Sequence, residues 1–189
     1  MKSINKILTF LLTTFFVLIF FEIFLDFSEI KLPPYITDNH LLGRSLVPNA
    51  KISYINESFN LSKVNEFGYL GTAYPKQKDD NVYRIALIGD SYVEGLQVKT
   101  SHHFSSILEN RLNSKTPNKK VEVLNFGRSG LDFRNMYIHY DLIAKDYNPN
   151  MIIIFINESD FTKKDNNLGP VVLLQDDTLL IDFSFNQSE

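Results

Sequence analysis

The chain has no cysteine, so disulfide bonds, cysteine-ligated zinc and a thiol nucleophile are all excluded. This absence does not fix the redox compartment, because a protein outside the cytoplasm can fold without disulfides. The chain also lacks the basic excess of a nucleic-acid-binding face, since 19 basic residues stand against 22 acidic ones, a net charge of −3. With 44% hydrophobic and 22% charged residues over 189 positions, we expect one folded domain rather than a disordered chain.

Signals for a metal or a cofactor are weak. The pairs Asp79-Asp80 and Asp176-Asp177 are interpreted as turn residues, as adjacent aspartates usually are. Gly89 and Gly95 lack the lysine of a phosphate-binding loop. We therefore expect no metal, no cofactor and no nucleic-acid partner.

One long apolar run stands at the start of the chain. Residues 7–25 contain a single charged residue, and a helix of that length spans roughly 28 Å, close to the thickness of a bilayer's hydrocarbon core. Lys2 and Lys6 precede the run, whereas Asp26 and Glu29 follow it. The positive-inside rule then predicts a cytoplasmic N-terminus and a C-terminal domain outside the cytoplasm.

Two other interpretations of this run are a cleaved signal peptide and a buried helix of a soluble protein. The run is longer than the apolar region of a usual signal peptide, and no cleavage site of small residues follows it. We therefore expect residues 1–27 to form an uncleaved, single-pass anchor in the cell membrane.

The remainder divides into an irregular extension over 28–82, with short strands such as Lys51–Ile55, and an α/β domain over 83–189. In this domain the patterns predict alternating strands and helices, then a hairpin that turns at Asp176-Asp177. The last strand of the alternation is apolar at every residue, which predicts that helices cover both of its faces. The expected fold class is α/β, a three-layer parallel sheet flanked by helices. The expected strands are 83–88, 121–124 and 151–156, and the expected helices are 101–111 and 132–147.

Three loops are expected to meet at the carboxyl ends of these strands, where such sheets bind ligands. Ser91 stands just past the first strand end, where a serine can be held exposed among backbone N–H groups, as a nucleophile requires. In the second loop, the N–H of Gly130 can approach a substrate oxygen with no side chain in the way. In the third loop, the amide of Asn157 can serve as a further oxyanion donor.

The three blocks resemble those of the SGNH (GDSL-type) hydrolase family. They read Gly89-Asp90-Ser91, Asn125-Phe126-Gly127-x-Ser129-Gly130, and an Asn/Asp loop over 157–161. The apolar N-terminal segment and the stretch Val64–Tyr69 are similar to the family's membrane-anchored bacterial branch. The resemblance implies a flavodoxin-like α/β fold, with Ser91 as the nucleophile and Gly130 as an oxyanion donor.

The third block departs from the family's usual Gly-x-Asn-Asp or Gly-Asn-Asp. When it is aligned on Asp160, Ser159 stands at the asparagine position and Glu158 at the glycine position. Asn157 takes the donor role only if the loop is shifted by two residues. Both alternatives, Asn157 and Ser159, stay open.

The family's fourth motif, Asp-x-x-His, which supplies the general base, is missing from this sequence. The four histidines are His40, His102, His103 and His139, and none has an Asp-x-x-His setting. We expect His102, His103 and His139 to be surface or helix-cap residues. Either the sequence is truncated, the interpretation we favour, or a genuine short protein has lost catalysis. The α/β domain is expected to be incomplete at its C-terminus, with an unpaired sheet edge and uncovered apolar faces.

Three function classes follow from these observations. The first is an envelope-facing serine esterase or O-acyltransferase that acts on acyl or acetyl esters of glycans or lipids. The second is a non-catalytic module on the same fold that binds an acylated glycan or a membrane partner. The third is an unrelated α/β domain behind an apolar anchor, because fold does not fix function.

Overall fold

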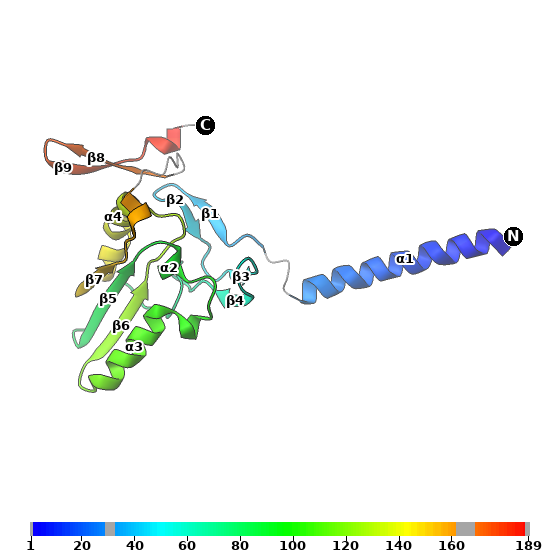
Figure 1. Cartoon of the computed structure of the whole chain (residues 1–189), viewed down its shortest axis with the longest axis horizontal. Coiled ribbons are helices and arrows are strands. Elements are labelled where there is room, and N and C mark those ends of the chain that lie inside the picture. Colours follow the sequence, from blue (N-terminus) through cyan, green and yellow to red (C-terminus); the bar gives the residue numbers. More distant parts are fainter. Residues whose placement is uncertain (1, 29–32, 162–168, 188–189) are drawn as a thin grey trace. The chain divides into compact units, whose positions relative to one another are not determined.

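The computed structural model describes residues 2–28, 33–161 and 169–187 (Figure 1). The chain forms two compact units, Met1–Pro33 and Pro34–Glu189.

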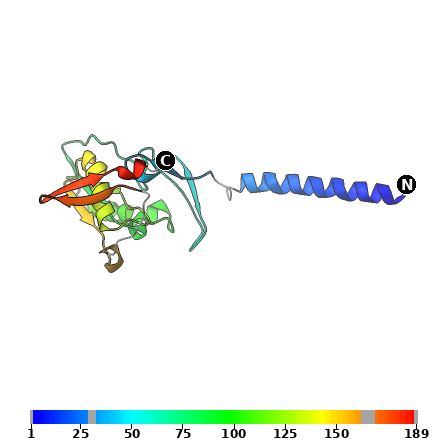
Figure 2. The same ribbon diagram turned by 90° about the horizontal axis from the view of Figure 1, so that it is seen from above.

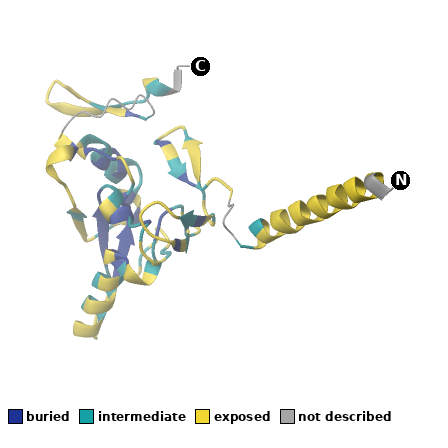
Figure 3. Ribbon diagram, turned by 45° about the vertical axis from the view of Figure 1, so that its right-hand side comes forward, coloured by how far each residue is buried: buried dark blue, intermediate teal, exposed yellow. Residues whose placement is uncertain are grey.

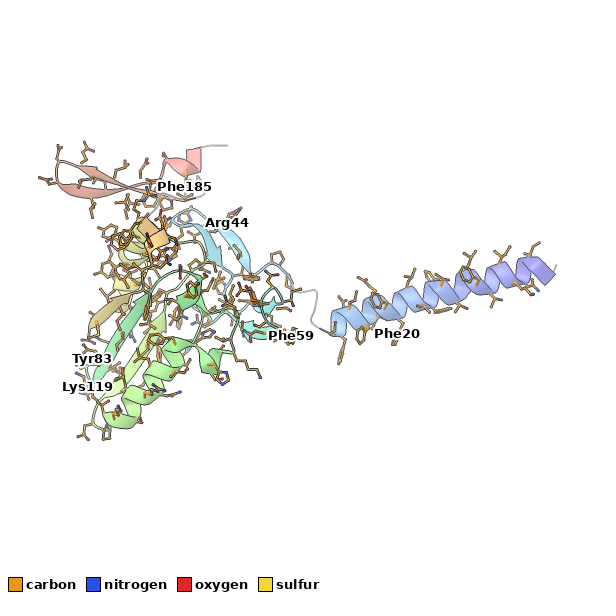
Figure 4. The ribbon with its side chains drawn as sticks, viewed as in Figure 1. Phe20, Arg44, Phe59, Tyr83, Lys119 and Phe185 are labelled. Atoms are coloured by element: carbon orange, nitrogen blue, oxygen red, sulfur yellow. The ribbon has the colours of Figure 1, made fainter. Side chains whose placement is uncertain are left out.

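The first unit is built around one helix, α1 (Lys2–Phe27). Its stretch Ile4–Phe27 is long and apolar enough to cross a membrane, with a mean hydropathy of 2.5. Its large apolar side chains, Phe20 among them, are exposed along the whole helix (Figures 3 and 4). The predicted apolar helix is therefore confirmed, whereas its direction through a membrane stays a prediction.

The second unit contains a three-stranded parallel sheet in the order β6-β5-β7 (Figure 1). The predicted strands at 83–88 and 121–124 are confirmed as β5 and β6, and the third as β7, which ends at Ile154. The elements of this unit are β1 (Ile36–Asn39), β2 (Gly43–Leu46), β3 (Lys51–Tyr54), β4 (Asn60–Lys63), β5 (Val82–Ile88), α2 (Ser91–Glu94), η1 (Thr100–His102), α3 (Phe104–Lys115), β6 (Lys120–Asn125), α4 (Phe133–Leu142), η2 (Ala144–Tyr147), β7 (Met151–Ile154), η3 (Glu158–Phe161), β8 (Val171–Gln175), β9 (Thr178–Asp182) and η4 (Ser184–Gln187).

Helices lie on both faces of the central strand β5 because its apolar side chains alternate. Leu87 belongs to a buried cluster against which Leu108 of α3 packs, on one face. Ala86 and Ile88 belong to a second cluster with Met136 of α4, on the other face. The strands β5 and β6 therefore lie at the buried centre of the unit (Figure 3). At the amino ends of the strands, Lys119 Nζ lies 4.9 Å from the centre of the Tyr83 ring (Figure 4).

Two expectations about the helices and the last strand are wrong. The helix expected over 132–147 ends at Leu142, and the separate 3₁₀ turn η2 follows it. The expectation that both faces of the last strand are covered is contradicted, because Met151, Ile152 and Ile154 are 45%, 39% and 41% exposed. In the described residues, β7 pairs with β5 alone and forms an edge of the sheet. The uncovered apolar edge that the short sheet predicts is confirmed.

Three antiparallel hairpins accompany the sheet, formed by β1-β2, β3-β4 and β8-β9. The turn of the last hairpin is Asp176-Asp177, as predicted, and both residues have positive φ values, 49° and 58°. Such values belong to the two-residue turns that match the twist of a hairpin. The β8-β9 hairpin lies beside α4 (Figure 2).

A buried arginine connects the central strand to three other segments. Nε and Nη2 of Arg84 donate to Glu122 Oε2 on β6 at 3.0 and 2.6 Å. Its Nη1 donates to the carbonyl oxygens of Tyr147 and Lys76 at 2.7 and 3.0 Å. The side chains of Arg84 and Glu122 are almost fully buried. Each therefore neutralises the other's charge, which water cannot reach.

Loss of this buried carboxylate is expected to destabilise the unit strongly. Glu122→Leu leaves the Arg84 charge buried and unpaired, so we expect the free energy of unfolding to fall by about 3–5 kcal/mol. Lys120→Gln is the matched control, because exposed Lys120 also contacts Glu122 but a surface pair contributes only about 0–1 kcal/mol. Urea denaturation followed by tyrosine fluorescence measures both variants. Equal losses would contradict the assigned importance of the buried pair.

Candidate functional site

Ser91 is the first residue of the short helix α2, directly beyond the end of β5. Asp90 caps this helix, since its Oδ1 accepts a hydrogen bond from the backbone N–H of Tyr92 at 3.0 Å. Gly89 permits the tight turn between the strand and the helix, because a Cβ at this position would lie 2.4 Å from Val93 Cγ2. The local sequence thus places a partly exposed serine at a helix N-terminus, as predicted for the first loop.

The second loop packs directly against the backbone of α2. A Cβ on Gly127 would lie 2.3 Å from the backbone nitrogen of Glu94 and 2.5 Å from the carbonyl carbon of Val93. Asn125 fixes the contact, since its Nδ2 donates to the Val93 carbonyl oxygen at 2.8 Å and its Oδ1 accepts from the Gly127 N–H at 2.9 Å. The first two predicted loops therefore meet.

The third loop reaches the first through Asn157. Its Nδ2 donates to Asp90 Oδ2 at 3.0 Å, next to Ser91. The backbone N–H of Asn157 donates to Asp160 Oδ2 at 2.9 Å, and Ser159 Oγ donates to Asn157 Oδ1 at 2.6 Å. Of the two candidates for the third donor, Asn157 makes the hydrogen bond to the first loop. The oxyanion role of either residue stays a prediction.

Gly130 has a positive φ of 84°, and no described atom lies within 4 Å of the position that its Cβ would take. The loop is therefore open at this residue, which is consistent with a backbone N–H that a ligand can approach.

Ser91 Oγ makes no hydrogen bond with any described residue, so none of them is already bonded to the serine as a general base would be. His102 is exposed, as expected. His103 stands at the N-cap of α3, also as expected, but it is buried, with Nε2 3.1 Å from the Val98 carbonyl oxygen. Burial lowers the pKa of His103 below its ordinary value. The burial of His103 and its contact with the Val98 carbonyl oxygen indicate a role in the fold.

His139 was expected at the surface or in a cap, and the structure shows it buried inside α4. Burial and the positive charge of Arg128 lower the pKa of His139 to about 3, so the imidazole is neutral at pH 7. The sequence carried a signal for this position, because His139 follows the core residue Met136 by three residues and so lies on the same helix face.

A buried acid on α2 binds the second loop, and the sequence analysis did not identify it. Glu94 Oε2 accepts hydrogen bonds from Ser129, from its N–H at 2.8 Å and from its Oγ. Glu94 Oε1 lies 3.6 Å from Nη1 of Arg128. The sequence offered one signal, an acidic residue three positions after Ser91. If such a carboxylate is buried, it needs hydrogen-bond donors nearby, and the second loop supplies them.

A cavity of about 460 Å³ lies beside the second loop. Gly130 lines it, but Ser91 does not. Arg44, which Figure 4 labels on β2, also lines it. A second cavity, of about 380 Å³, shares Arg128 and His139 with the first. In the described residues, no group of three or more acidic or histidine side chains is arranged to hold a metal ion.

No protein-family model and no curated protein sequence matches this chain.

The contact between Gly127 and α2 is expected to tolerate no side chain. Gly127→Ala places a methyl group against two backbone atoms, so we expect a loss of about 3 kcal/mol in the free energy of unfolding, the upper end of what overpacking typically costs. Gly130→Ala meets no atom and is strained only by its positive φ, an effect of about 1–2 kcal/mol. Chemical denaturation compares them, and a larger loss for Gly130→Ala would contradict the assigned packing.

The buried neutral His139 is expected to make the fold sensitive to acid. Between about pH 6.5 and 3 the unfolded chain binds a proton on this imidazole and the folded chain does not, so stability falls as the pH falls through this window. We expect a slope of up to about 1.4 kcal/mol per pH unit from this residue. His139→Gln flattens the slope, whereas exposed His102→Gln leaves it unchanged. Urea midpoints measured from pH 7.5 to 4.5 test this, and identical slopes for wild type and His139→Gln would exclude it.

Proposed function

We propose that this protein is a membrane-anchored member of the SGNH (GDSL-type) hydrolase family with a flavodoxin-like α/β fold. Its substrates are acyl or acetyl esters of envelope glycans or lipids, and Ser91 is the nucleophile. The observation that carries the proposal is the meeting of three loops at one sheet edge, where Asn157 donates to Asp90 directly beside Ser91.

The proposed reaction proceeds through an acyl-enzyme. Ser91 Oγ forms a bond to the ester carbonyl carbon, and the backbone N–H groups of Ser91 and Gly130, with the Asn157 amide, bind the developing oxyanion. The ester C–O bond then breaks, and the alcohol leaves with the proton that the serine gave up. Water or a sugar hydroxyl attacks the acyl-serine and restores the free hydroxyl.

The transfer of the serine proton requires a base, and no described residue makes a hydrogen bond with Ser91 Oγ. Without a base, a serine nucleophile loses several orders of magnitude in rate. This observation favours a second candidate function, a non-catalytic module that binds an acylated glycan through the same oxyanion donors.

The helix α1 serves as the membrane anchor in this proposal. Lys2 and Lys6 keep its N-terminal end in the cytoplasm, and the α/β unit faces the envelope outside the cytoplasm. This placement agrees with a substrate among envelope glycans or lipids.

A fluorophosphonate probe on the full-length protein in detergent micelles tests the nucleophile. If Ser91 is the nucleophile, the probe labels the protein, Ser91→Ala abolishes this labelling, and Asn157→Ala slows it by about 10²-fold, the effect of one oxyanion donor. Ser101→Ala, a change of an exposed serine outside the three loops, leaves labelling intact. A folded wild-type protein that does not react would refute the catalytic proposal and favour the binding module.

A further inference from the structure

The cavity beside Gly130 has the size and composition of a ligand site. Its volume of about 460 Å³ falls within the range of small-molecule pockets, about 300–1,000 Å³. Its walls come from the β1-β2 hairpin, β3, α2 and the residues after it, the loop after β6, α4, and Gly169 and Pro170 before β8. The lining combines apolar side chains such as Leu131 and Ile138 with residues that carry hydroxyl, amide, imidazole and guanidinium groups.

Arg128 brings buried donors without a hydrogen bond to this cavity. Its Nε and Nη1 are buried and have no hydrogen-bond partner in the described part of the chain. Glu94 Oε1 lies 3.6 Å from Arg128 Nη1, an ion pair longer than a hydrogen bond, while Glu94 Oε2 accepts from the Ser129 N–H. An unmade hydrogen bond of a buried donor destabilises a protein by about 1–3 kcal/mol, more when the group is charged. An anionic oxygen that draws this guanidinium into a direct pair would remove that deficit.

The charge balance of the cavity also favours an anion. Arg44 and Arg128 are its basic residues and Glu94 is its acidic residue, so the described lining carries a net charge of +1. His139 adds no charge at pH 7, because burial holds its pKa at about 3.

The remaining polar groups suit a hydroxylated ring rather than an acyl chain. Tyr35 and Tyr54 line the cavity with an aromatic ring and a hydroxyl each, and Asn135 adds an amide. The His139 imidazole makes no hydrogen bond with another described residue. An acyl chain would leave these groups unpaired, whereas sugar hydroxyls can pair with them.

We propose that this cavity binds a sugar residue that carries an anionic group, a carboxylate or a phosphate, with the anion paired to Arg128. The sugar ring lies between the tyrosines and α4. This proposal specifies the substrate class of the proposed function. It rests on that function only for the link between the cavity and Ser91, which the loop that contains Gly130 provides.

Binding is measured by calorimetry on the full-length Ser91→Ala protein in micelles, so that no turnover interferes. The probes are glucuronate, glucose 6-phosphate, glucose and inorganic phosphate. We expect at least one anionic sugar to bind about tenfold or more tightly than both glucose and phosphate. The two anionic sugars distinguish a carboxylate from a phosphate.

Three variants locate the site. Arg128→Lys keeps the charge beside Glu94 but loses the planar fork, and we expect it to weaken binding about tenfold or more. Leu42→Trp fills the cavity without removing a charge and abolishes binding. Arg111→Lys, on the exposed surface of α3, is the matched control and leaves binding unchanged.

Glucose that binds as tightly as glucuronate and glucose 6-phosphate would overturn the anionic part of the proposal. Inorganic phosphate that binds as tightly as both anionic sugars would overturn the sugar part. Affinity that survives Leu42→Trp would place the ligand elsewhere, and this variant decides if Arg128→Lys fails to fold. Binding with no fluorophosphonate labelling of Ser91 would refute the catalytic function alone.

Discussion

The contact between Gly127 and the backbone of α2 holds the candidate site together. With no side chain at this position, the second loop reaches the short helix that carries Ser91, and Asn125 fixes the two at hydrogen-bond distance. The hydrogen bonds between Ser129 and Glu94, the burial of Glu94 and the cavity that Glu94 and Gly130 line depend on this approach. Gly127 has no positive φ, so it is required here for the space that a side chain would occupy. This close approach sets the geometry of the site.

Much of the fold could be predicted from the sequence because its local signals agree with each other. The apolar run of β5 ends at a glycine, and the pair Asp176-Asp177 predicted a hairpin turn that the structure contains. The loops that follow β5, β6 and β7 could be predicted to meet, because parallel strands carry their carboxyl ends to one edge. The end of α4 at Leu142, with Ile143 as its C-cap, carried no such signal in the sequence. Helix propensity does not show where tertiary packing ends a helix.

The charged part of the site could not be predicted in the same way. Glu94 and Arg128 are 34 positions apart by their residue numbers, and neither stands in a pattern that distinguishes a buried charge from a solvated one. The apolar run Met151–Ile156 predicted burial on both faces, but what covers a strand depends on its neighbours and not on its own residues. The cavity beside Gly130 likewise combines residues from elements far apart in the sequence, so its lining could not be predicted from local patterns.

The arrangement around Arg84 has a consequence for how the protein is made. The central strand β5 is synthesised before both of its neighbours, and the backbone N–H of Arg84 pairs with Asn150 Oδ1, 66 positions later. At translation rates of about 5–20 residues per second, this delay amounts to roughly 3–13 s. During that interval the edge of β5 that pairs with β7 stays unpaired and the Arg84 guanidinium lacks the Tyr147 carbonyl oxygen, whereas Glu122 on β6 is synthesised 38 positions after Arg84. The β5-β6 pair can form first, but the three-stranded sheet is complete only after β7 has been synthesised.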